Sequence, residues 1–394
     1  MSRLEELIQQ YCPDGVEYMK LGEIESNGII KLGRGNVISK QDIKECPGDF
    51  PVYSSSSVGD GEIGRYGKYM FDDERISWSI DGGGKFFYRN NLKYSITNVS
   101  GWLKVLDPKT VSTKYLYYSL MNEWVKKVYD YTHKAHPSVI REEYEIPVPP
   151  LPVQEEIVRI LDSFTELQAE LQAELQKRTQ QYAYYKDKLL SGDYPTMKIG
   201  DITRVFSASR VHKNEWKTSG VPFYRSSDVM SFHRGEKNTR GEVFISEELF
   251  EKLSAKSGRI KIGDLLVTGG GSIGVPYIVN FEPLYVKDAD LLCIVKNDIL
   301  DNRFLYHYMR SEKFKDYLSS ITHDATIAHY TISQIKETPV PVPTWDEQQR
   351  IITILDKFDT LINDLSQGLP AEIEARRKQY EYYRDQLLTF KQKA

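Results

Sequence analysis

A long segment of this chain occurs twice, and this repeat limits the folds that the chain can adopt. The first copy runs from about Pro147 to Leu190, and the second runs from about Pro341 to Leu388. Residues of the first copy recur in the same order in the second, and four extra positions lie inside the second copy. A motif of this length in two distant copies indicates a duplicated unit.

Each copy is predicted to be helical. Apolar residues between Ile157 and Leu189 recur at spacings of three and four, which places them on one face of a helix. The prolines that begin each copy favour extended backbone before the helix. In the second copy, residues 366–370 read Ser-Gln-Gly-Leu-Pro, so one helix is expected to end there and another to begin. The two matched stripes favour a pair of long antiparallel helices over helices buried in an ordinary core.

Length and composition favour a cytoplasmic protein of two or three domains. The chain has 394 residues, of which 40% are hydrophobic and 12% aromatic. Its 27 tyrosines are typical of contact surfaces that are partly exposed to water. It contains no apolar run of about 18 residues, and its polar opening does not read as a signal peptide. Cys12, Cys46 and Cys293 lie too far apart for metal-ligand or disulfide spacing. We therefore expect no membrane segment and no metal site.

The net charge of −4 does not by itself indicate a nucleic-acid partner. The acidic excess belongs to the expected helical parts, whereas the two blocks between them carry about one net positive charge each. A basic DNA-binding face on either block must therefore be balanced by an acidic face elsewhere. These differences divide the chain into 1–17, 18–150, 151–192, 193–343 and 344–394.

The two blocks share several short landmark segments. The sequences between these landmarks differ almost completely. Both open with similar segments, both contain a Pro-x-Tyr step and a glycine run, and both have a similar aromatic segment before a Thr-His step. The matched stretches are 18–24 with 196–202, 51–56 with 222–227, 81–84 with 268–271, and 114–117 with 303–306. This pattern indicates one scaffold that carries two different sets of loops.

Short strand-like runs alternate with Gly- and Ser-rich turns in each block, and helices follow late. Strands are expected at 69–71, 85–88, 103–106, 264–268, 275–279 and 291–295. Helices are expected at 4–11, 113–131 and 302–318. This order predicts an α+β fold.

No motif supports catalysis. Residues 59–64 and 269–274 fit GxGxxG, but no helix is expected after either, as a dinucleotide or S-adenosylmethionine loop requires. Asp14 with Asp42 and Lys44 fits a loose nuclease pattern, although the Cys-Pro-Asp-Gly at 12–15 is better explained as a helix stop. The sequence has no Walker A, HExxH or Asp/Asn-Pro-Pro-aromatic segment. The histidines at 133, 136, 323 and 329 are more consistent with packing or phosphate contact than with general bases.

Both blocks interleave Lys and Arg with aromatics, Ser and Asn in expected loops. Lys and Arg neutralise phosphates, and Arg, Asn, Gln and Ser read base edges in the major groove. The alternative is solvated loop charge without a partner. The candidate DNA-binding residues are Lys31, Arg34, Lys40, Arg65, Lys68, Lys85, Arg89, Arg204, Arg210, Lys213, Lys217, Arg225, Arg234, Lys237 and Arg240.

The whole chain resembles the specificity (S) subunits of type I restriction-modification systems. The resemblance is carried by the two Pro-Val-Pro segments that lead to Leu-Asp-x-Phe, and by the two Gln-Tyr-x-Tyr-Tyr-Lys/Arg-Asp-x-Leu-Leu endings. Leu7-Ile8 and the Cys-Pro-Asp-Gly-Val at 12–16 add to it. The resemblance implies an α+β chain with two pseudo-symmetric globular target-recognition domains, 18–150 and 193–343, separated by a pair of long antiparallel helices.

The same resemblance implies a non-catalytic, DNA-binding subunit without a cofactor of its own. Each domain would read one half of a split double-stranded DNA site, and two methyltransferase subunits would dock on the helices of 151–192 and 344–394. The partners would carry S-adenosylmethionine, ATP and Mg, and restriction/translocase subunits would join the complex. The docking candidates are Tyr182, Tyr185, Leu189, Tyr380, Tyr383 and Leu387. The alternatives are a specificity subunit of a methyltransferase-only system, a self-contained DNA methyltransferase or nuclease, and a coiled-coil scaffold that binds no DNA.

Overall fold

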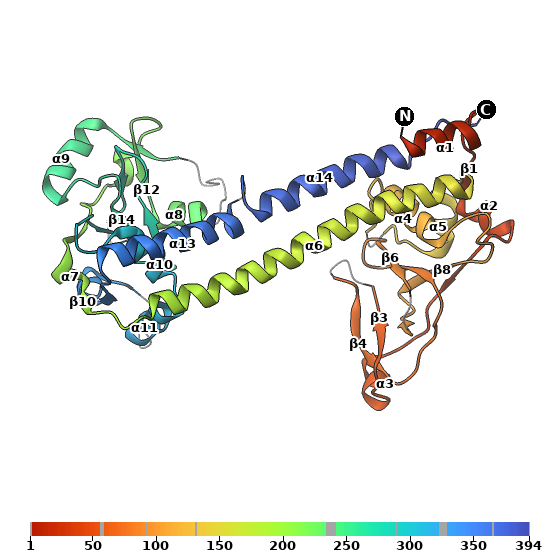
Figure 1. The fold of residues 1–394 in the computed structure, drawn as a ribbon, viewed down its shortest axis with the longest axis horizontal. Helices are drawn as coiled ribbons and strands as arrows, with labels where there is room; N and C mark the ends of the chain where they lie inside the picture. The colour runs from red at the N-terminus through yellow and green to blue at the C-terminus, as the bar shows by residue number, and fades with distance from the viewer. Residues whose placement is uncertain are drawn as a thin grey trace. The chain divides into compact units, whose positions relative to one another are not determined.

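The computed structural model describes residues 2–55, 59–90, 93–130, 132–233, 242–288, 290–322, 329–364 and 366–393. The chain forms two compact units (Figure 1): unit 1 comprises Met1–Glu170 with Glu374–Ala394, and unit 2 comprises Leu171–Ile373. Helix α6 (Leu151–Leu190) is continuous across the boundary between them. Among the described residues, no helix is both long enough and apolar enough to cross a membrane.

The described residues of unit 1 form three small sheets. A four-stranded antiparallel sheet has the order β2-β8-β5-β6, and a three-stranded sheet has the order β4-β3-β7. A two-stranded ladder joins β1 and β9. The bounds are β1 Tyr18–Lys20, β2 Ile30–Arg34, β3 Phe50–Tyr53, β4 Glu62–Tyr66, β5 Arg75–Ser79, β6 Phe86–Arg89, β7 Ser95–Ile96, β8 Ser100–Val105 and β9 Glu145–Pro147.

Helices cover the core of unit 1. The core gathers Leu21, Trp78, Tyr115 and Ile157, all of them buried. The helices that belong wholly to this unit are α1 Arg3–Tyr11, α2 Leu21–Ser26, α3 Lys40–Glu45, α4 Thr113–Trp124 and α5 Pro137–Glu143. The first part of α6 and most of α14 (Leu369–Leu387) complete the unit.

The two ends of the chain are joined within unit 1. Helix α1 begins with a capping box between Ser2 and Glu5 and ends before Gly15, whose φ is 109°. Val16 then forms a bridge with Gln392 and exchanges backbone hydrogen bonds with Lys391 and Lys393. A side chain at position 15 would meet the carbonyl oxygen of Lys391 at 2.5 Å, so the close approach of the two segments requires glycine.

Unit 2 repeats the arrangement of unit 1 with different loops. Its four-stranded sheet has the order β11-β17-β14-β15, its three-stranded sheet the order β13-β12-β16, and its ladder joins β10 and β18. The strand bounds are β10 Thr196–Lys198, β11 Val205–Ser207, β12 Val221–Tyr224, β13 Phe244–Ile245, β14 Leu265–Thr268, β15 Pro276–Ile278, β16 Tyr285–Val286, β17 Leu291–Ile294 and β18 Pro339–Pro341. The helices are α7 Ile199–Ile202, α8 Ser226–His233, α9 Glu247–Ser257, α10 Asn302–Met309, α11 Glu312–Thr322, α12 Ile332–Glu337 and α13 Trp345–Asn363, with a 3₁₀ turn at Lys213–Glu215.

The duplication is visible in strand pairing as well as in strand order. Strand β3 pairs antiparallel with β4 and parallel with β7, and β12 pairs antiparallel with β13 and parallel with β16. Tyr53 and Tyr224 end these two central strands. The residues between the shared landmarks therefore differ on the same framework, as the sequence predicted.

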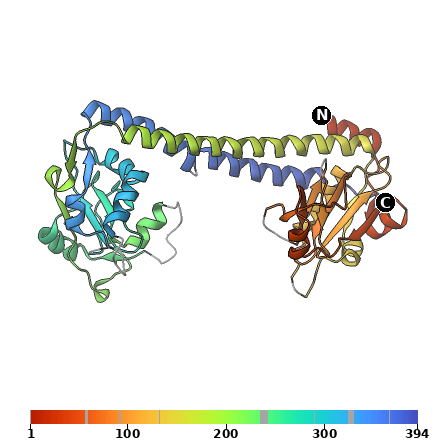
Figure 2. The ribbon, with the colours of Figure 1, turned by 90° about the horizontal axis from the view of Figure 1, so that it is seen from below.

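Each unit packs the beginning of one repeat copy against the end of the other. In unit 1, α14 runs alongside the first part of α6 in the opposite direction (Figures 1 and 2), and the Phe164 ring lies 5.5 Å from the Tyr383 ring. In unit 2, α13 runs alongside the last part of α6, with the Phe358 and Tyr185 rings 5.9 Å apart. The antiparallel helix pair is thus built twice from both copies of the repeat.

The expected break in the second copy is present, because α13 ends at Asn363 and α14 begins at Leu369. The helix expected at 4–11 is also present. Neither GxGxxG segment is followed by a helix, since strand β4 begins within the first segment and strand β15 follows the second. The expected strands at 85–88, 103–106, 264–268, 275–279 and 291–295 correspond to β6, β8, β14, β15 and β17. The pattern of short apolar runs therefore predicted most of the core strands.

Three sequence predictions were wrong in detail. Helix α4 ends at Trp124 rather than near residue 131, because the Lys126 and Lys127 amides bond to the carbonyl oxygens three residues earlier, at Glu123 and Trp124, and close the last turn. The helix expected at 302–318 is two helices, since the Ser311 hydroxyl caps α11 at Phe314. The segment 69–71 forms only an isolated bridge from Phe71 to Tyr94 rather than a strand.

Candidate nucleic-acid interface

Each variable block begins and ends at one short ladder. In unit 1, Tyr18 pairs with Pro147 across β1 and β9, and in unit 2, Thr196 pairs with Pro341 across β10 and β18. The two ends of a block therefore lie side by side next to the helical repeat. This arrangement lets the loops of a block vary without changing how the block joins the helices.

A buried glutamine fastens each block to its helix. The Gln348 side chain of α13 accepts a hydrogen bond from the Asp301 amide at 2.8 Å and donates to the Ile299 and Pro343 carbonyl oxygens at 2.9 and 3.0 Å. Gln154 of α6 makes the same three contacts in unit 1, with the Ser112 amide and the Thr110 and Pro149 carbonyl oxygens. Both side chains are fully buried, so their amide groups depend on these backbone partners for hydrogen bonds.

A repeated aspartate forms a second anchor. In unit 1, Asp162 binds the Lys114 ammonium at 2.7 Å and the Tyr118 hydroxyl at 2.6 Å. In unit 2, Asp356 binds the Arg303 guanidinium at 2.8 Å and His307 Nε2 at 2.7 Å. Helices α4 and α10 each follow the last strand of their four-stranded sheet. Each is thus bound to the helical repeat by an equivalent aspartate, Asp162 in unit 1 and Asp356 in unit 2.

The two aspartate anchors differ in their titration. Burial lowers the pKa of His307 more than the hydrogen bond and charge of Asp356 raise it. Burial alone would raise the pKa of Asp356, but the His307 hydrogen bond and the Arg303 charge outweigh burial and lower it. In unit 1, burial and the bond to Asp162 raise the pKa of Tyr118 far above neutral pH. Of the two anchors, the one in unit 2 contains a histidine, and burial lowers the pKa of that histidine.

The structure brings several unit 1 candidates together around α3 and β4. Lys40 begins α3, Arg65 lies in β4 and Lys68 follows it, and all three are exposed. Hydrogen bonds from Ser39 and then the charge of Lys68 lower the pKa of Asp42, which caps α3. The loose nuclease pattern thus contains a carboxylate that serves as a helix cap.

The remaining unit 1 candidates lie on the four-stranded sheet. Lys31 and Arg34 are exposed on β2, and Lys85 is half-buried beside Phe87. Arg89 is only 6% exposed, because its guanidinium lies 3.5 Å from the Tyr53 ring centroid and donates to the Asp60 carbonyl oxygen. Arg89 therefore holds this unit together internally, whereas the other candidates present their charge to solvent.

In unit 2 the exposed candidates gather before β12. Arg204, Arg210, Lys213 and Lys217 are exposed, and the Arg210 guanidinium is 3.1 Å from Asp288. Arg225 is largely covered and forms an ion pair with Asp228 at 2.9 Å. Arg234, Lys237 and Arg240 lie outside the described residues, as does His323.

The six docking candidates do not share one environment. Tyr182 is buried, and Tyr380, Leu189 and Leu387 pack against the cores of their units. Tyr185 and Tyr383 are 37% and 40% exposed. Their neighbours Tyr184 and Tyr382 are more exposed, at 61% and 62%, and were not among the candidates.

Sequence reasoning missed several residues that organise the site. Gln154, Gln348, Asp162 and Asp356 lie in the repeat, but their partners come from distant segments that no spacing rule connects. The exposure of Tyr184 and Tyr382 could have been predicted from the sequence, because both lie one position away from the apolar stripe. Neither the anchors nor these tyrosines form a catalytic arrangement.

Two copies of one known domain cover this architecture: residues 13–179 and 192–375 match the family described as type I restriction modification DNA specificity domain. The chain belongs to the type I restriction-modification specificity subunits. Specificity subunits of this family are non-catalytic and carry two target-recognition domains. In this specificity subunit the two domains are built on the two repeated frameworks described above.

Similar proteins cover nearly the whole specificity subunit. A putative type I restriction enzyme specificity subunit of Haemophilus influenzae is 32% identical over 399 residues, which cover 95% of this chain and 96% of that protein. A putative type I specificity subunit of Mycoplasma pneumoniae is 30% identical over 376 residues, with 94% and 98% covered. The crystal structure of an S subunit from M. genitalium has a TM-score of 0.59 at 17% identity, and the match covers 95% of this chain and 96% of that one. The last comparison supports the fold.

Proposed function

We propose that this specificity subunit reads a split double-stranded DNA site, one half with each target-recognition domain. The observation that carries the proposal is that two units share a framework and anchors but differ in their solvent-exposed loops. In unit 1 the exposed cations are those around α3, β4 and β2, and in unit 2 they are Arg210, Lys213 and Lys217 with Arg204. Such side chains neutralise phosphates and reach base edges.

Methyltransferase subunits would dock on the repeated helical endings. The Tyr184 and Tyr185 rings lie 5.4 Å apart at an interplanar angle of 74°, and Tyr382 and Tyr383 repeat this at 5.4 Å and 76°. Exposed aromatic pairs of this kind suit the centre of a protein–protein interface. Their presence in both units fits two copies of one partner.

The partners would carry the chemistry of the complex. S-adenosylmethionine, ATP and Mg would bind methyltransferase and restriction/translocase subunits, and this chain would hold no cofactor. The assembly would act on DNA in the cytoplasm. A system with methyltransferase subunits and no restriction subunit remains the second form of this proposal, and both forms use the same surfaces of this chain.

Selection from a random-sequence duplex library tests the proposal. The purified chain, with and without copurified methyltransferase subunits, should enrich two short fixed sequences separated by a spacer of fixed length. Supplied with S-adenosylmethionine alone, the chain should transfer no methyl group and cleave no DNA. One continuous enriched sequence, no enrichment at all, or methyl transfer by the chain alone would overturn it.

Variants of the same chain connect the activity to the cations. Replacing Arg210 and Lys213 with Ala should weaken binding through the second half-site. A lost phosphate contact should weaken all sequences about equally, whereas a lost base contact should cost about 1–3 kcal/mol and relax one position. The matched control replaces Lys313 and Lys315 of α11, which removes the same charge from the exposed surface of another helix and should preserve the selected sequence.

A further inference from the structure

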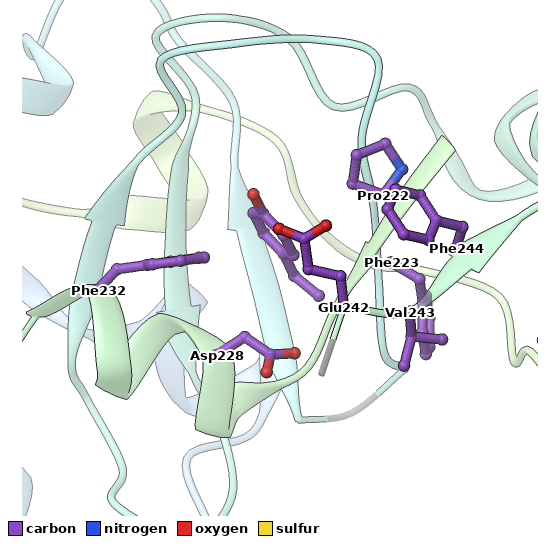
Figure 3. A pocket seen from close by; sticks show the side chains of 8 residues that line it. Pro222, Phe223, Asp228, Phe232, Glu242, Val243 and Phe244 are labelled. Atoms are coloured by element: carbon purple, nitrogen blue, oxygen red, sulfur yellow. The ribbon is translucent and has the colours of Figure 1, made fainter. Parts of the chain in front are cut away.

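An aromatic pocket opens beside the three-stranded sheet of unit 2, between β12, the start of β13 and α8 (Figure 3). Its empty space, together with the adjoining space open to solvent, is about 470 Å³. Its lining includes Tyr224, Phe232 and Phe244 together with the carboxylates of Asp228 and Glu242. The side chains of Phe232, Asp228 and Glu242 point toward the same central space in Figure 3. None of the cations assigned to DNA contact above lines the pocket.

The aromatic wall of the pocket is partly open to solvent. The Tyr224 and Phe232 rings lie 5.0 Å apart, and Phe232 is 36% exposed. Behind them, Tyr277 lies 5.8 Å from Phe232 and Phe281 lies 5.7 Å from Tyr224. This continuous aromatic surface offers a face on which a planar group can stack.

The two carboxylates of the pocket differ in what they bind. Asp228 accepts from the Arg225 guanidinium and from the Arg225 backbone amide, at distances of 2.8–2.9 Å. Glu242 is exposed and makes no hydrogen bond or ion pair with any residue in the described part of the chain. Its carboxylate therefore gives the pocket an acceptor and a negative charge. A phosphate would be repelled there, and an N–H donor would be attracted.

Unit 1 shows what covers the matching tyrosine. Tyr53 ends β3 as Tyr224 ends β12, and both central strands have one antiparallel and one parallel neighbour. In unit 1 the planar Arg89 guanidinium lies 3.5 Å from the Tyr53 ring centroid and donates to Asp60 and Ser77. The chain itself thus places a flat, N–H-bearing group on this tyrosine in unit 1, and the matching place in unit 2 is a pocket.

We infer that the pocket of unit 2 takes a nucleobase with an exocyclic amino group, unstacked from the bound DNA. The base would stack against Phe232 and Tyr224 and donate its amino N–H to Glu242. Thymine fits this chemistry worse, because it has no exocyclic amino group and presents O4 as an acceptor. The inference rests on the proposed function, since it assumes that unit 2 binds DNA.

A cationic side chain of a partner protein shares part of this chemistry, since it also binds aromatic faces and carboxylates. The position of the pocket favours the nucleobase. Lys217 pairs through its backbone with Phe244 of the pocket, and Arg225 directly follows Tyr224. Lys217 is among the exposed cations proposed above to contact DNA, so bound DNA would pass close to the pocket mouth.

Mismatched duplexes test the inference, because unstacking a base requires breaking its pair. The full chain, with the subunits that copurify with it, is titrated with its selected duplex and with duplexes mismatched at each position. A mismatch opposite an unstacked base removes part of the unpairing cost and should tighten binding about tenfold at one amino-bearing base of the second half-site. Mismatches in the first half-site should give no such gain.

Variants connect this gain to the pocket. Phe232→Ala and Glu242→Gln should reduce the gain to less than about twofold, while Ile262→Ala, an exposed apolar residue of the same unit, should keep it. The inference is overturned if every mismatch weakens binding or if the gain survives in both pocket variants. It is also overturned if Phe232→Ala leaves DNA binding unchanged and weakens only assembly with protein subunits. Failure of the matched duplex to bind specifically would instead overturn the proposed function.

Discussion

The carboxylates of Asp162 and Asp356 hold the same place in the two units but bind different side chains. Asp162 accepts from the Tyr118 hydroxyl, and Asp356 accepts from His307 Nε2. A phenol remains neutral across the physiological pH range, whereas a histidine titrates within it. The unit 2 anchor is therefore the one whose stability should depend on pH near neutrality.

The direction of this dependence follows from the lowered pKa of His307. A histidine with a lower pKa in the folded than in the unfolded chain binds fewer protons when folded. Its contribution is complete above the unfolded pKa of about 6.5 and is lost as the pH falls toward the native pKa. At pH 5.5 the loss is at most about 1.4 kcal/mol. The lowered pKa of Asp356 acts in the same direction, but below about pH 3.9.

Hydrogen exchange of α10 and α13 at pH 7.5 and 5.5, corrected for the intrinsic rate, measures this loss. Protection of both helices should fall at pH 5.5, while α4 in unit 1 keeps its protection. In His307→Gln, which keeps a donor for Asp356 and does not titrate, the pH effect should disappear. An equal loss in α4, or an unchanged loss in the variant, would show that another group is responsible.

The exposed tyrosines give a second prediction at the residue scale. Tyr184→Ser and Tyr382→Ser remove aromatic surface that packs little within the chain, and each should weaken methyltransferase binding by about 2 kcal/mol or more if it lies at the interface centre. Copurification and titration with the methyltransferase subunit measure the loss. Tyr11→Ser, at 44% exposure on α1, is the control and should bind normally. Normal binding by both Tyr184→Ser and Tyr382→Ser would show that the methyltransferase subunits dock on another surface.

Individual contacts were the part of the site that sequence could not predict. The repeat made Asp162 and Asp356 visible as matched residues, but Tyr118 and His307 approach them only after folding. Likewise, a Lys- and Arg-rich loop looks the same in sequence whether its side chain is exposed, as in Lys213, or stacked inside the unit, as in Arg89. The burial of a side chain depends on residues distant in sequence, so local composition does not predict it.

At the scale of elements, each block depends on one glutamine for its attachment. Gln348→Met keeps the size of the side chain but leaves the Asp301 amide and two carbonyl oxygens without their partner. A fully buried group left unpaired costs about 1–3 kcal/mol and a partly exposed group costs less, so unit 2 should lose about 2 kcal/mol or more. The Asp301 amide should exchange faster, and the Ser112 amide of unit 1 should not.

Two further variants control for this effect. Gln154→Met should reverse the pattern: the Ser112 amide should exchange faster, and the exchange rate of the Asp301 amide should not change. Gln349→Met removes a single bond, to the Asp301 side chain, and should cost about 1 kcal/mol. Equal destabilisation by Gln349→Met and Gln348→Met would contradict the assigned role of the buried glutamine.

Helix α6 carries the third element-scale argument. Between Leu161 of the unit 1 core and Tyr182 of the unit 2 core, none of its residues is buried. This segment includes a Glu-Leu-Gln-Ala repeat at residues 166–175. Phe164 packs against Tyr383 and Leu175 packs against the unit 2 core, so the segment can change length without disturbing these contacts only if the added residues keep its packed face in register. Its length should then set the spacer between the half-sites, if the helix holds the two domains at a fixed separation.

Inserting Glu-Leu-Gln-Ala after Ala173 tests this role. Four residues lengthen the helix by about 6 Å and turn it by about 400°, so the partly buried stripe stays nearly in register. With base pairs about 3.4 Å apart, the preferred spacer should grow by roughly one or two base pairs. Mapping modified sites on genomic DNA measures the spacer. A two-residue insertion turns the stripe by about 200° and should disrupt helix pairing, while an unchanged spacer after the four-residue insertion would show that α6 is not the ruler.

The helical elements and most strands were predictable because their periodicity is local. The failures at 113–131 and 302–318 came from hydrogen bonds at helix ends: α4 closes with i→i−3 backbone bonds at Lys126 and Lys127, and the Ser311 hydroxyl begins α11. The pattern of apolar residues continues past both points, so periodicity alone carries the prediction too far.

At the scale of the whole molecule, the repeat predicted two similar domains, and the division of the chain at residues 17, 150, 192 and 343 stays a prediction. How the two repeat copies pack against each other was harder to predict from the sequence. Each unit contains the start of one copy and the end of the other, so that Phe164 meets Tyr383 and Phe358 meets Tyr185. Sequence similarity shows that two segments are alike, but it does not show which copy packs against which.

The most direct test of the account exchanges one variable block. Residues 196–338 begin on β10 and end beside β18, where Lys198 pairs with Pro339, so a foreign block can join the same ladder. The exchanged chain, carrying the matching block of a relative, is then used to select duplexes from a random library. The account predicts that the second half-site changes completely, while the first half-site and the spacer stay as they were. A change in both half-sites together would contradict the claim that the two domains read DNA independently.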